Sequence, residues 1–224
     1  MRPAAVVTGA GSGIGREIAL ALAKKGTSVF GVALGEGELA RLAADAAALG
    51  GEVQTMAIDL TRAGAPLEVL EEAERRGLVV ETLVNCAGVG VYGEHLDTEV
   101  DAVSKMITLN AAVLTELTTL AARRMRTRGR GNILNVASTA AFQPLPRLAA
   151  YAATKHYVAA FTLALREELA GTGVVVSLLC PGITNTPFIE GTGVKGGSRT
   201  DAVARRIAMT PESVARAAVS ALET

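Results

Sequence analysis

The chain has 224 residues, of which 50% are hydrophobic and only 3% aromatic, and its 22 basic residues balance 22 acidic ones. This length allows one large domain with a sizeable core, and the composition excludes disordered and fibrous proteins. Zero net charge gives no overall field that would recruit nucleic acid or an anionic membrane surface, so small molecules are the expected partners.

Export, membrane insertion and metal binding all lack support in the sequence. Residues 1–8 run into glycines too early to contain the apolar core of a signal peptide. No apolar run approaches the roughly 18 residues that span a bilayer. His95 and His156 lie far apart, and Cys86 and Cys180 each end an apolar run, which suits small buried residues. A cytoplasmic protein without a metal site, a disulfide or a membrane span is expected.

A glycine-rich turn follows the first predicted strand. The apolar run at 4–7 predicts a strand, the helical pattern at 16–25 predicts a helix, and between them stands Thr8-Gly9-Ala10-Gly11-Ser12-Gly13-Ile14-Gly15. Glycines let the backbone approach a ligand closely, and a helix N-terminus offers free N–H groups to a pyrophosphate. The spacing is neither GxGxxG nor GxxxxGK[ST], which disfavours a kinase or ATPase. A phosphate-binding turn is predicted, with a merely flexible loop as the alternative.

Strand and helix patterns then alternate along the whole chain. Further strands are predicted at 28–34, 53–58, 82–85, 132–137 and 174–179, and helices at 38–49, 66–76, 98–128, 151–170 and from 210 onward. This alternation predicts an α/β protein with a doubly wound sheet. No repeat or linker divides residues 1–224, so a single domain is expected. The glycine-rich segment 183–200 lacks periodicity and is predicted to be a substrate loop.

The end of the second predicted strand normally selects the cofactor in such folds. A carboxylate there binds the adenosine ribose hydroxyls, whereas a basic residue accepts a 2′-phosphate. This chain has Leu34 and Gly35 at that place, Glu36 slightly later, and an uncharged Ser12 in the glycine turn. The choice between NAD and NADP therefore stays open.

Tyr151 and Lys155 stand four residues apart at the start of a predicted helix. That spacing places their Cβ atoms about 5–6 Å apart on one face. A nearby ammonium favours the phenolate and lowers the pKa of a tyrosine from about 10, which would make the pair a tuned acid and base. The alternative is an ordinary helical tyrosine and lysine, and only the rest of the chain can decide between them.

Two features of the long helical pattern at 98–128 have competing interpretations. Asn110 interrupts an apolar pattern, and an exposed surface asparagine is the simplest explanation. Five arginines between 123 and 130 suit the negative end of a helix dipole. A nucleic-acid surface is the weaker alternative, because no aromatic residues interleave with the arginines.

Six motifs, at this order and spacing, resemble the classical short-chain dehydrogenases/reductases. They are the glycine turn at 8–15, Asn85-Cys86-Ala87-Gly88, Asn110, Ser138, Tyr151-Ala-Ala-Thr-Lys155 and Pro181-Gly182. The resemblance covers nearly the whole chain. It implies a Rossmann-type doubly wound parallel sheet of about six strands in the order 3-2-1-4-5-6, with helices on both faces. It also implies NAD(H) or NADP(H) as cofactor and interconversion of a hydroxyl and a carbonyl by hydride transfer.

The resemblance assigns four catalytic residues. Tyr151 would pass a proton to or from the substrate oxygen, and Lys155 would lower its pKa and hold the nicotinamide ribose. Ser138 would orient the substrate carbonyl or hydroxyl. Asn110 would hold a water that links Lys155 to solvent.

The resemblance also implies where the cofactor binds. The pyrophosphate would lie on the glycine turn, adenine between two residues after the third strand, the adenosine side against the fourth-strand loop, and the carboxamide near the segment after the sixth strand. The residues implied are Gly9, Ser12, Gly13, Ile14 and Gly15 for the pyrophosphate, Asp59 and Leu60 for adenine, Asn85, Ala87 and Gly88 for the adenosine side, and Pro181, Gly182, Thr184 and Thr186 for the carboxamide end. Leu34 at the end of the second strand, Tyr151 and Lys155 complete the set.

The chain departs from the family pattern at Cys86, where a second asparagine is usual, and in lacking the usual seventh strand after the last helix. Because family tetramers commonly use that edge, a homodimer built on the helices around Asn110 and Tyr151 is expected. Whether the strand is naturally absent or was removed is left open. The segments expected to face the substrate are mostly apolar, which predicts a hydrophobic alcohol or ketone; they contain Val89, Val91, Tyr92, Phe142, Leu145, Phe188 and Ile189.

Two other functions compete with an oxidoreductase. A catalytically idle dinucleotide-binding regulator needs the fold but no proton transfer, and the complete set of Asn110, Ser138, Tyr151 and Lys155 argues against it. A sugar-nucleotide epimerase of the extended relatives would carry an additional C-terminal substrate domain, for which this sequence has no residues.

Overall fold

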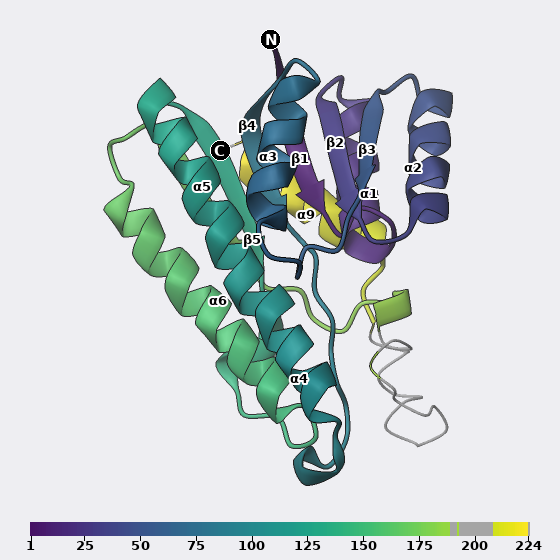
Figure 1. The fold of residues 1–224 in the computed structure, drawn as a ribbon, viewed down its shortest axis with the longest axis vertical. Helices are drawn as coiled ribbons and strands as arrows, with labels where there is room; N and C mark the ends of the chain where they lie inside the picture. Colours follow the sequence, from purple (N-terminus) through teal and green to yellow (C-terminus); the bar gives the residue numbers. More distant parts are fainter. Residues whose placement is uncertain (189–191, 193–207, 224) are drawn as a thin grey trace.

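Six parallel strands form one sheet in the order β3-β2-β1-β4-β5-β6, as predicted (Figure 1). A computed structural model describes residues 1–188, 192 and 208–223. The expected substrate loop at 183–200, and Ile189 with it, lies mostly outside these residues. The strands are β1 Arg2–Thr8, β2 Ser28–Ala33, β3 Val53–Ala57, β4 Leu78–Asn85, β5 Gly131–Val136 and β6 Val174–Leu179; the helices are α1 Gly13–Lys24, α2 Glu36–Ala48, α3 Ala65–Arg75, α4 Val100–Ile107, α5 Leu114–Arg128, α6 Ala149–Glu168 and α9 Pro211–Leu222.

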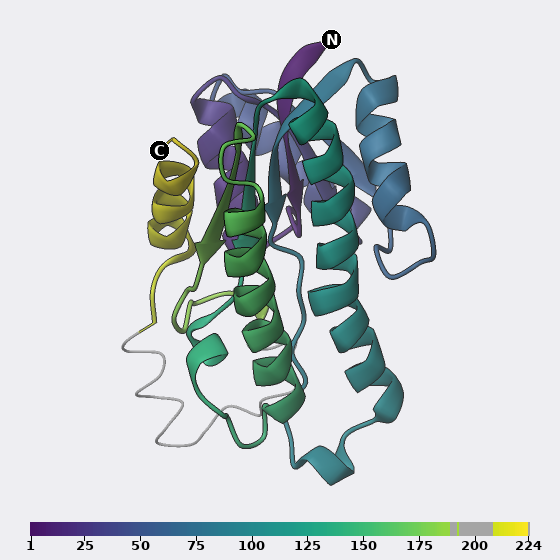
Figure 2. The ribbon, with the colours of Figure 1, turned by 90° about the vertical axis from the view of Figure 1, so that its left-hand side faces the viewer.

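Helices cover both faces of the sheet, which explains why its strands are apolar on both sides (Figures 1 and 2). Successive residues of a strand point to opposite faces. In β1, Ala4 and Val6 pack in the core beneath α3 and α5, whereas Ala5 and Val7 pack in the core beneath α1, α2 and α9. The polypeptide therefore buries two cores with one sheet between them.

Most predicted element boundaries agree with the structure to within two residues. The helix predicted from Arg16 begins three residues earlier, at Gly13. The strand predicted from Thr82 begins four residues earlier at Leu78. Its pairing with β1 shifts register between Ala4 and Ala5, and such an irregularity has no simple sequence signal.

The predicted continuous helix at 98–128 consists of three segments. A short 3₁₀ turn at His95–Asp97 precedes α4, and a π-helical turn at Thr108–Val113 joins α4 to α5. Asn110 lies in this π-helical turn, and only 1% of its surface is exposed. The surface interpretation of Asn110 is therefore wrong, and π-helical turns are common at functional sites.

A buried polar network lies beneath the ends of β4 and β5. Asn85 Nδ2 donates to Asn135 Oδ1 at 2.9 Å and to Thr118 Oγ1 at 2.8 Å. Asn135 Nδ2 in turn donates to Thr162 Oγ1 at 3.1 Å. These bonds tie α5 and α6 to the sheet just below the site described next.

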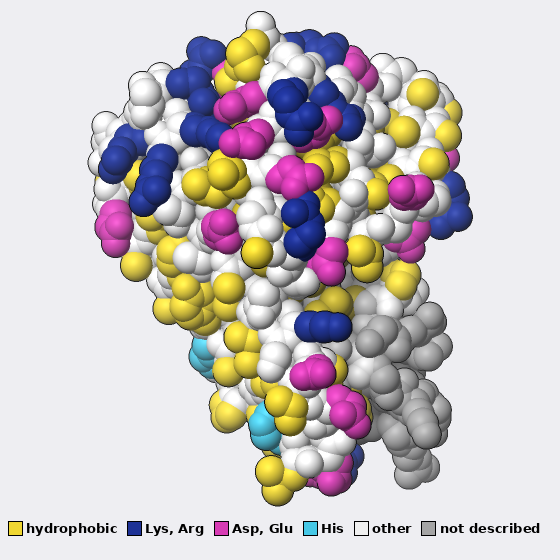
Figure 3. Space-filling model, viewed as in Figure 1, with side chains coloured by type: hydrophobic (Ala, Val, Ile, Leu, Met, Phe, Trp, Pro, Cys, Tyr) yellow, Lys and Arg dark blue, Asp and Glu magenta, His cyan; other side chains and the backbone are white. Residues whose placement is uncertain are grey.

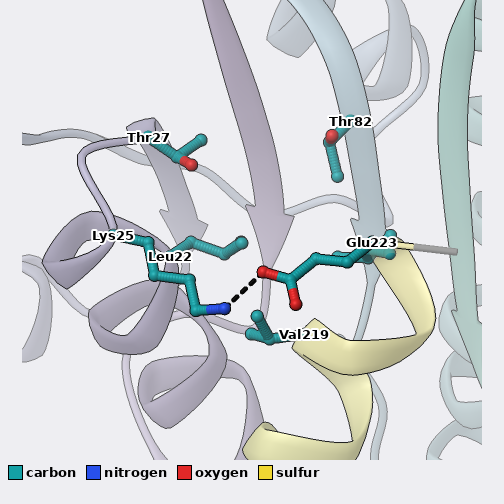
Figure 4. A pocket seen from close by; sticks show the side chains of 7 residues that line it. Leu22, Lys25, Thr27, Thr82, Val219 and Glu223 are labelled. Carbon is teal, nitrogen blue, oxygen red and sulfur yellow. Dashed lines mark hydrogen bonds and ion pairs between the residues drawn. The ribbon is translucent and has the colours of Figure 1, made fainter.

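Helix α9 closes the sheet on the side of α1. Thr210 caps it by accepting a hydrogen bond from the Ser213 backbone N–H at 3.2 Å. At its other end Glu223 pairs with Lys25 across a hollow of about 470 Å³ between α1 and α9 (Figure 4). This hollow lies at the opposite end of α1 from the glycine turn.

The surface in Figure 3 divides into two regions. Charged side chains gather over the end of the sheet where the chain starts, whereas hydrophobic side chains are spread along α4, α5 and α6. Among the described residues, no helix combines the length and apolar character that crossing a membrane requires.

Candidate active site

The ends of four strands bring the predicted site residues to one edge of the sheet. The glycine turn follows β1, the Cys86 to Gly90 segment follows β4, Ser138 follows β5 and Pro181 follows β6. Because all six strands are parallel, these segments leave the sheet at the same edge. Ligands bind at this edge in open α/β sheets.

Tyr151 and Lys155 lie in the first turns of α6 and point into this edge. The Lys155 Nζ atom is 5.7 Å from the centre of the Tyr151 ring, and Nζ donates to the Val136 carbonyl at 3.1 Å. Ser138 lies near enough to the Tyr151 phenol to lower its pKa. The Ser138 hydroxyl also accepts from the Ala140 backbone N–H at 3.1 Å, which fixes its rotamer.

Burial dominates the ionisation of both catalytic candidates. Burial raises the pKa of Tyr151, and its hydrogen bond with Ser138 opposes that rise. Burial also lowers the pKa of Lys155 from 10.5 to about 8. Lys155 does not hold the pKa of Tyr151 below its ordinary value here, because the ammonium bonds the Val136 carbonyl rather than the phenol oxygen.

The Asn110 side chain holds the loop that follows β4. Its Oδ1 accepts from the Val89 backbone N–H at 3.0 Å, and its Nδ2 donates to the Val89 carbonyl at 2.9 Å. Nδ2 also lies 3.2 Å from Thr154 Oγ1, one residue before Lys155. A Cβ atom on Gly88 would lie 3.1 Å from Asn110 Oδ1 and 3.6 Å from Lys155 Nζ. The loop, the π-helical turn and Lys155 therefore meet at one point.

The glycine turn has the geometry of a phosphate cradle. Gly9 and Gly13 have φ angles of +70° and +54°, which favour glycine. A Cβ on Gly15 would lie 2.3 Å from the Gly9 carbonyl oxygen. Ser12 is the N-cap of α1, but its side chain makes no capping hydrogen bond, so the first N–H groups stay available to an anion. These features fit a dinucleotide pyrophosphate.

Two neighbouring segments pack directly on this turn. The Thr8 hydroxyl accepts from the Cys86 and Ala87 backbone N–H groups, both at 3.1 Å. A Cβ on Gly9 would lie 2.9 Å from Ala87, and one on Gly13 would lie 3.1 Å from Thr186 Cγ2. Thr8 was not predicted as a site residue, although a hydroxyl before a glycine turn is a suitable acceptor for such N–H groups.

The remaining predicted cofactor residues lie at the same edge in different environments. Leu34, at the end of β2, is 74% exposed. Asp59 accepts from Thr61 Oγ1 and N–H, and these bonds lower its pKa. Leu60 is buried in the core, and the Asn85 side chain belongs to the buried network, so a ligand can meet only its backbone.

The segment after β6 reaches Tyr151, one of the catalytic candidates. Thr139 N–H donates to the Pro181 carbonyl at 2.9 Å, and Thr184 Oγ1 donates to the Gly182 carbonyl at 3.0 Å. The Phe188 ring lies 5.6 Å from the Tyr151 ring, centre to centre. An aromatic side chain therefore borders the reactive phenol.

A profile of the short chain dehydrogenase family matches residues 3–193. The chain belongs to this family. The Mycobacterium tuberculosis protein named probable oxidoreductase EphD is 36% identical over 84% of the chain, but the chain spans only 32% of its length. A single-residue variant of the actinorhodin polyketide ketoreductase, solved with NADPH, is 31% identical with a TM-score of 0.89, covering 99% of this chain and 90% of that one. A short-chain dehydrogenase/reductase from Burkholderia phymatum, solved with NAD, is 27% identical with a TM-score of 0.87, covering 99% and 86%.

In this short-chain dehydrogenase, Cys86 replaces the usual second asparagine without introducing a reactive thiol. Burial raises the pKa of Cys86 to about 12. Cys180 is also a free cysteine, and burial raises its pKa as well. Among the described residues, no group of acidic, histidine and cysteine side chains is arranged to hold a metal ion.

Several arginines near the end of α5 have protein partners. Arg124 pairs with Glu74, Arg130 pairs with Glu81, and Arg128 donates to the Val80 carbonyl at 2.7 Å. These arginines fix α5 to α3 and β4, which supports a structural role for them.

Proposed function

We propose that the chain is an NAD(P)-dependent oxidoreductase that interconverts a hydroxyl and a carbonyl on a small hydrophobic substrate. The observation that carries this proposal is the convergence of Ser138, Tyr151 and Lys155 beside the glycine turn, with Asn110 behind them. Family membership and relatives solved with NADPH and with NAD support the same reaction class.

The chain's residues fit a nicotinamide dinucleotide, which would supply or accept the hydride when bound. Gly9, Ser12, Gly13, Ile14 and Gly15 would hold its pyrophosphate at the N-terminus of α1. Leu34, Asp59 and Leu60 would lie near the adenosine, with the backbone of Asn85, Ala87 and Gly88. Pro181, Gly182, Thr184 and Thr186 would border the nicotinamide, and Lys155 its ribose.

Tyr151 would protonate the substrate oxygen during reduction and accept the proton during oxidation. Ser138, which lies near the phenol, would align the substrate oxygen with it. Lys155 would turn from the Val136 carbonyl towards the cofactor ribose and the phenol, where its charge favours phenolate. Asn110, held rigidly by Val89, would place a water that connects Lys155 to solvent.

This proposal predicts a pH dependence with a definite sign. Lys155 is protonated below its pKa of about 8 and loses its charge as the pH rises through that value. We therefore expect kcat/KM for the reduced dinucleotide, which reports the enzyme before the cofactor binds, to fall above pH 8. It should be measured at subsaturating dinucleotide and saturating ketone from neutral to alkaline pH. A profile that stays flat through this range would contradict the role of Lys155.

Apolar side chains support the remaining parts of the proposal. Val89 and Phe142 are 43% and 67% exposed on segments near the site, which suits a hydrophobic substrate. Ile107 and Leu163 are also exposed, on α4 and α6, at 45% and 41%. Such a surface suits a homodimer built on these helices.

A cytoplasmic location remains part of the proposal.

Turnover with a panel of apolar ketones and alcohols tests the proposed function. Reduced nicotinamide should be consumed with at least one ketone, and oxidised nicotinamide should be reduced with the corresponding alcohol. The competing function is a dinucleotide-binding regulator. Tight cofactor binding without turnover across the whole panel would favour the regulator.

A further inference from the structure

We propose that Glu38 makes this protein select NAD(H) over NADP(H). Its carboxylate would accept hydrogen bonds from the adenosine ribose hydroxyls and repel a 2′-phosphate. The inference rests on the proposed function and deepens it, because it assigns the choice that the neutral end of β2 leaves open.

The Glu38 carboxylate lies between the glycine turn and the end of β2. A Cβ atom on Gly11 would lie 2.7 Å from Glu38 Oε2, and one on Gly35 would lie 3.0 Å from the same oxygen. The Ala10 N–H donates to the Val32 carbonyl at 3.1 Å, which fixes the turn against β2. Oε2 therefore stands in the crevice between the first two strands of the nucleotide-binding half.

This crevice is where the adenosine ribose binds in dinucleotide-binding folds. A carboxylate there accepts hydrogen bonds from ribose hydroxyls, and charge-assisted bonds of this kind are the stronger ones. Glu38 would bind the ribose hydroxyls from the first turn of α2, as an acidic residue at the end of β2 would bind them from the strand. The difference in position explains why the end of β2 can be the neutral Leu34.

A basic residue of α1, at the end of the helix that carries the glycine turn, already has acidic partners. Arg16, in the first turns of α1, pairs with Glu17 and Asp45. The hydrogen bonds and ion pairs of the described residues include none made by Glu38, so its carboxylate is available to a ligand. Arg41, three residues later on α2, is the basic residue that a 2′-phosphate would have to recruit.

Glu36 offers a matched control on the same helix. Glu36 and Glu38 both lie in the first turn of α2 and carry the same charge. Of these two glutamates, only Glu38 is among the closest neighbours of Gly11 and Gly35. Replacing each by glutamine therefore separates a specific contact from a general change in charge near the helix N-terminus.

Equilibrium titration of the purified protein with NADH and with NADPH tests the inference without relying on turnover. The native protein should bind NADH at least about tenfold more tightly than NADPH, because repulsion between the Glu38 carboxylate and the 2′-phosphate of NADPH is worth at least that factor at close range. Glu38→Gln should tighten NADPH binding by about tenfold and weaken NADH binding a few-fold. Glu36→Gln should leave the ratio of the two affinities within about twofold of the native value.

Four results would overturn the inference. Native protein that binds NADPH as tightly as NADH, or Glu38→Gln with an unchanged ratio of affinities, would remove Glu38 from cofactor selection while the dinucleotide-dependent function stands. Loss of NADPH binding in Arg41→Gln at unchanged NADH affinity would show that Arg41 recruits the 2′-phosphate despite Glu38. Binding of neither cofactor to the native protein would instead overturn the proposed function, and the inference with it.

Discussion

Replacing Tyr151 with phenylalanine should reduce kcat by about 10²–10⁴-fold, the range that general acid–base catalysis contributes. The phenol is the group that would exchange a proton with the substrate oxygen, and Ser138 lies near it. Cofactor affinity should change little, because phenylalanine keeps the ring and Lys155 can still turn from the Val136 carbonyl towards the cofactor ribose. Steady-state kinetics and cofactor titration on the same preparation would measure both quantities.

Tyr157→Phe is the control for the tyrosine experiment. Tyr157 lies on the same helix but is 45% exposed, and its hydroxyl lies 3.0 Å from Thr115 Oγ1 rather than near the site. Its loss should leave kcat within about twofold, as expected for an exposed hydroxyl. Full turnover by Tyr151→Phe, or an equal loss in Tyr157→Phe, would contradict the proton-transfer role of Tyr151.

Gly15→Ala should abolish tight cofactor binding and lower the free energy of unfolding by about 1–3 kcal/mol. The new Cβ would lie 2.3 Å from the Gly9 carbonyl oxygen and 2.8 Å from its carbon. Both are backbone atoms, so the clash cannot be relieved by rotating a side chain. The glycine turn must move away from α1, and the N–H groups that would face the pyrophosphate lose their alignment.

Gly37→Ala provides the matched control for this glycine substitution. A Cβ on Gly37 would meet nothing within 4 Å, and its φ angle is not in the left-handed region. Alanine in the helix should stabilise the protein by about 1 kcal/mol and leave cofactor binding unchanged. Denaturant unfolding and dinucleotide titration of both variants would test this. Native-like cofactor affinity in Gly15→Ala would contradict a turn that cradles phosphate.

The sequence predicted the architecture well because its signals are local. Apolar β-branched runs, the glycine turn and the Thr210-Pro211 helix start each act over a few residues, and the alternation of strands and helices leaves few topologies. The four-residue spacing of Tyr151 and Lys155 likewise placed both side chains on one face, as the structure shows. These predictions needed no knowledge of distant contacts.

Predictions that depend on tertiary contacts were less successful. Asn110 can be buried because its side-chain amide makes two hydrogen bonds with the backbone of Val89, which follows β4. No local sequence pattern predicts this distant partner. The expectation that Lys155 lowers the pKa of Tyr151 left burial out, whereas burial is the largest cause of both pKa shifts. The position of Glu38 depends on how α2 folds back over the glycine turn. Sequence spacing alone pointed to Leu34 and Glu36 instead.

Isotope transfer from the cofactor is the most direct test of the proposed function. The protein would be incubated with an accepted ketone and with reduced nicotinamide dinucleotide carrying deuterium at the hydride position, and the alcohol product would be analysed by mass spectrometry. Direct hydride transfer predicts one deuterium on the carbinol carbon, and the signal should fall away in Tyr151→Phe. Alcohol without deuterium from cofactor labelled on each face in turn, or no alcohol from any ketone despite tight cofactor binding, would contradict an oxidoreductase.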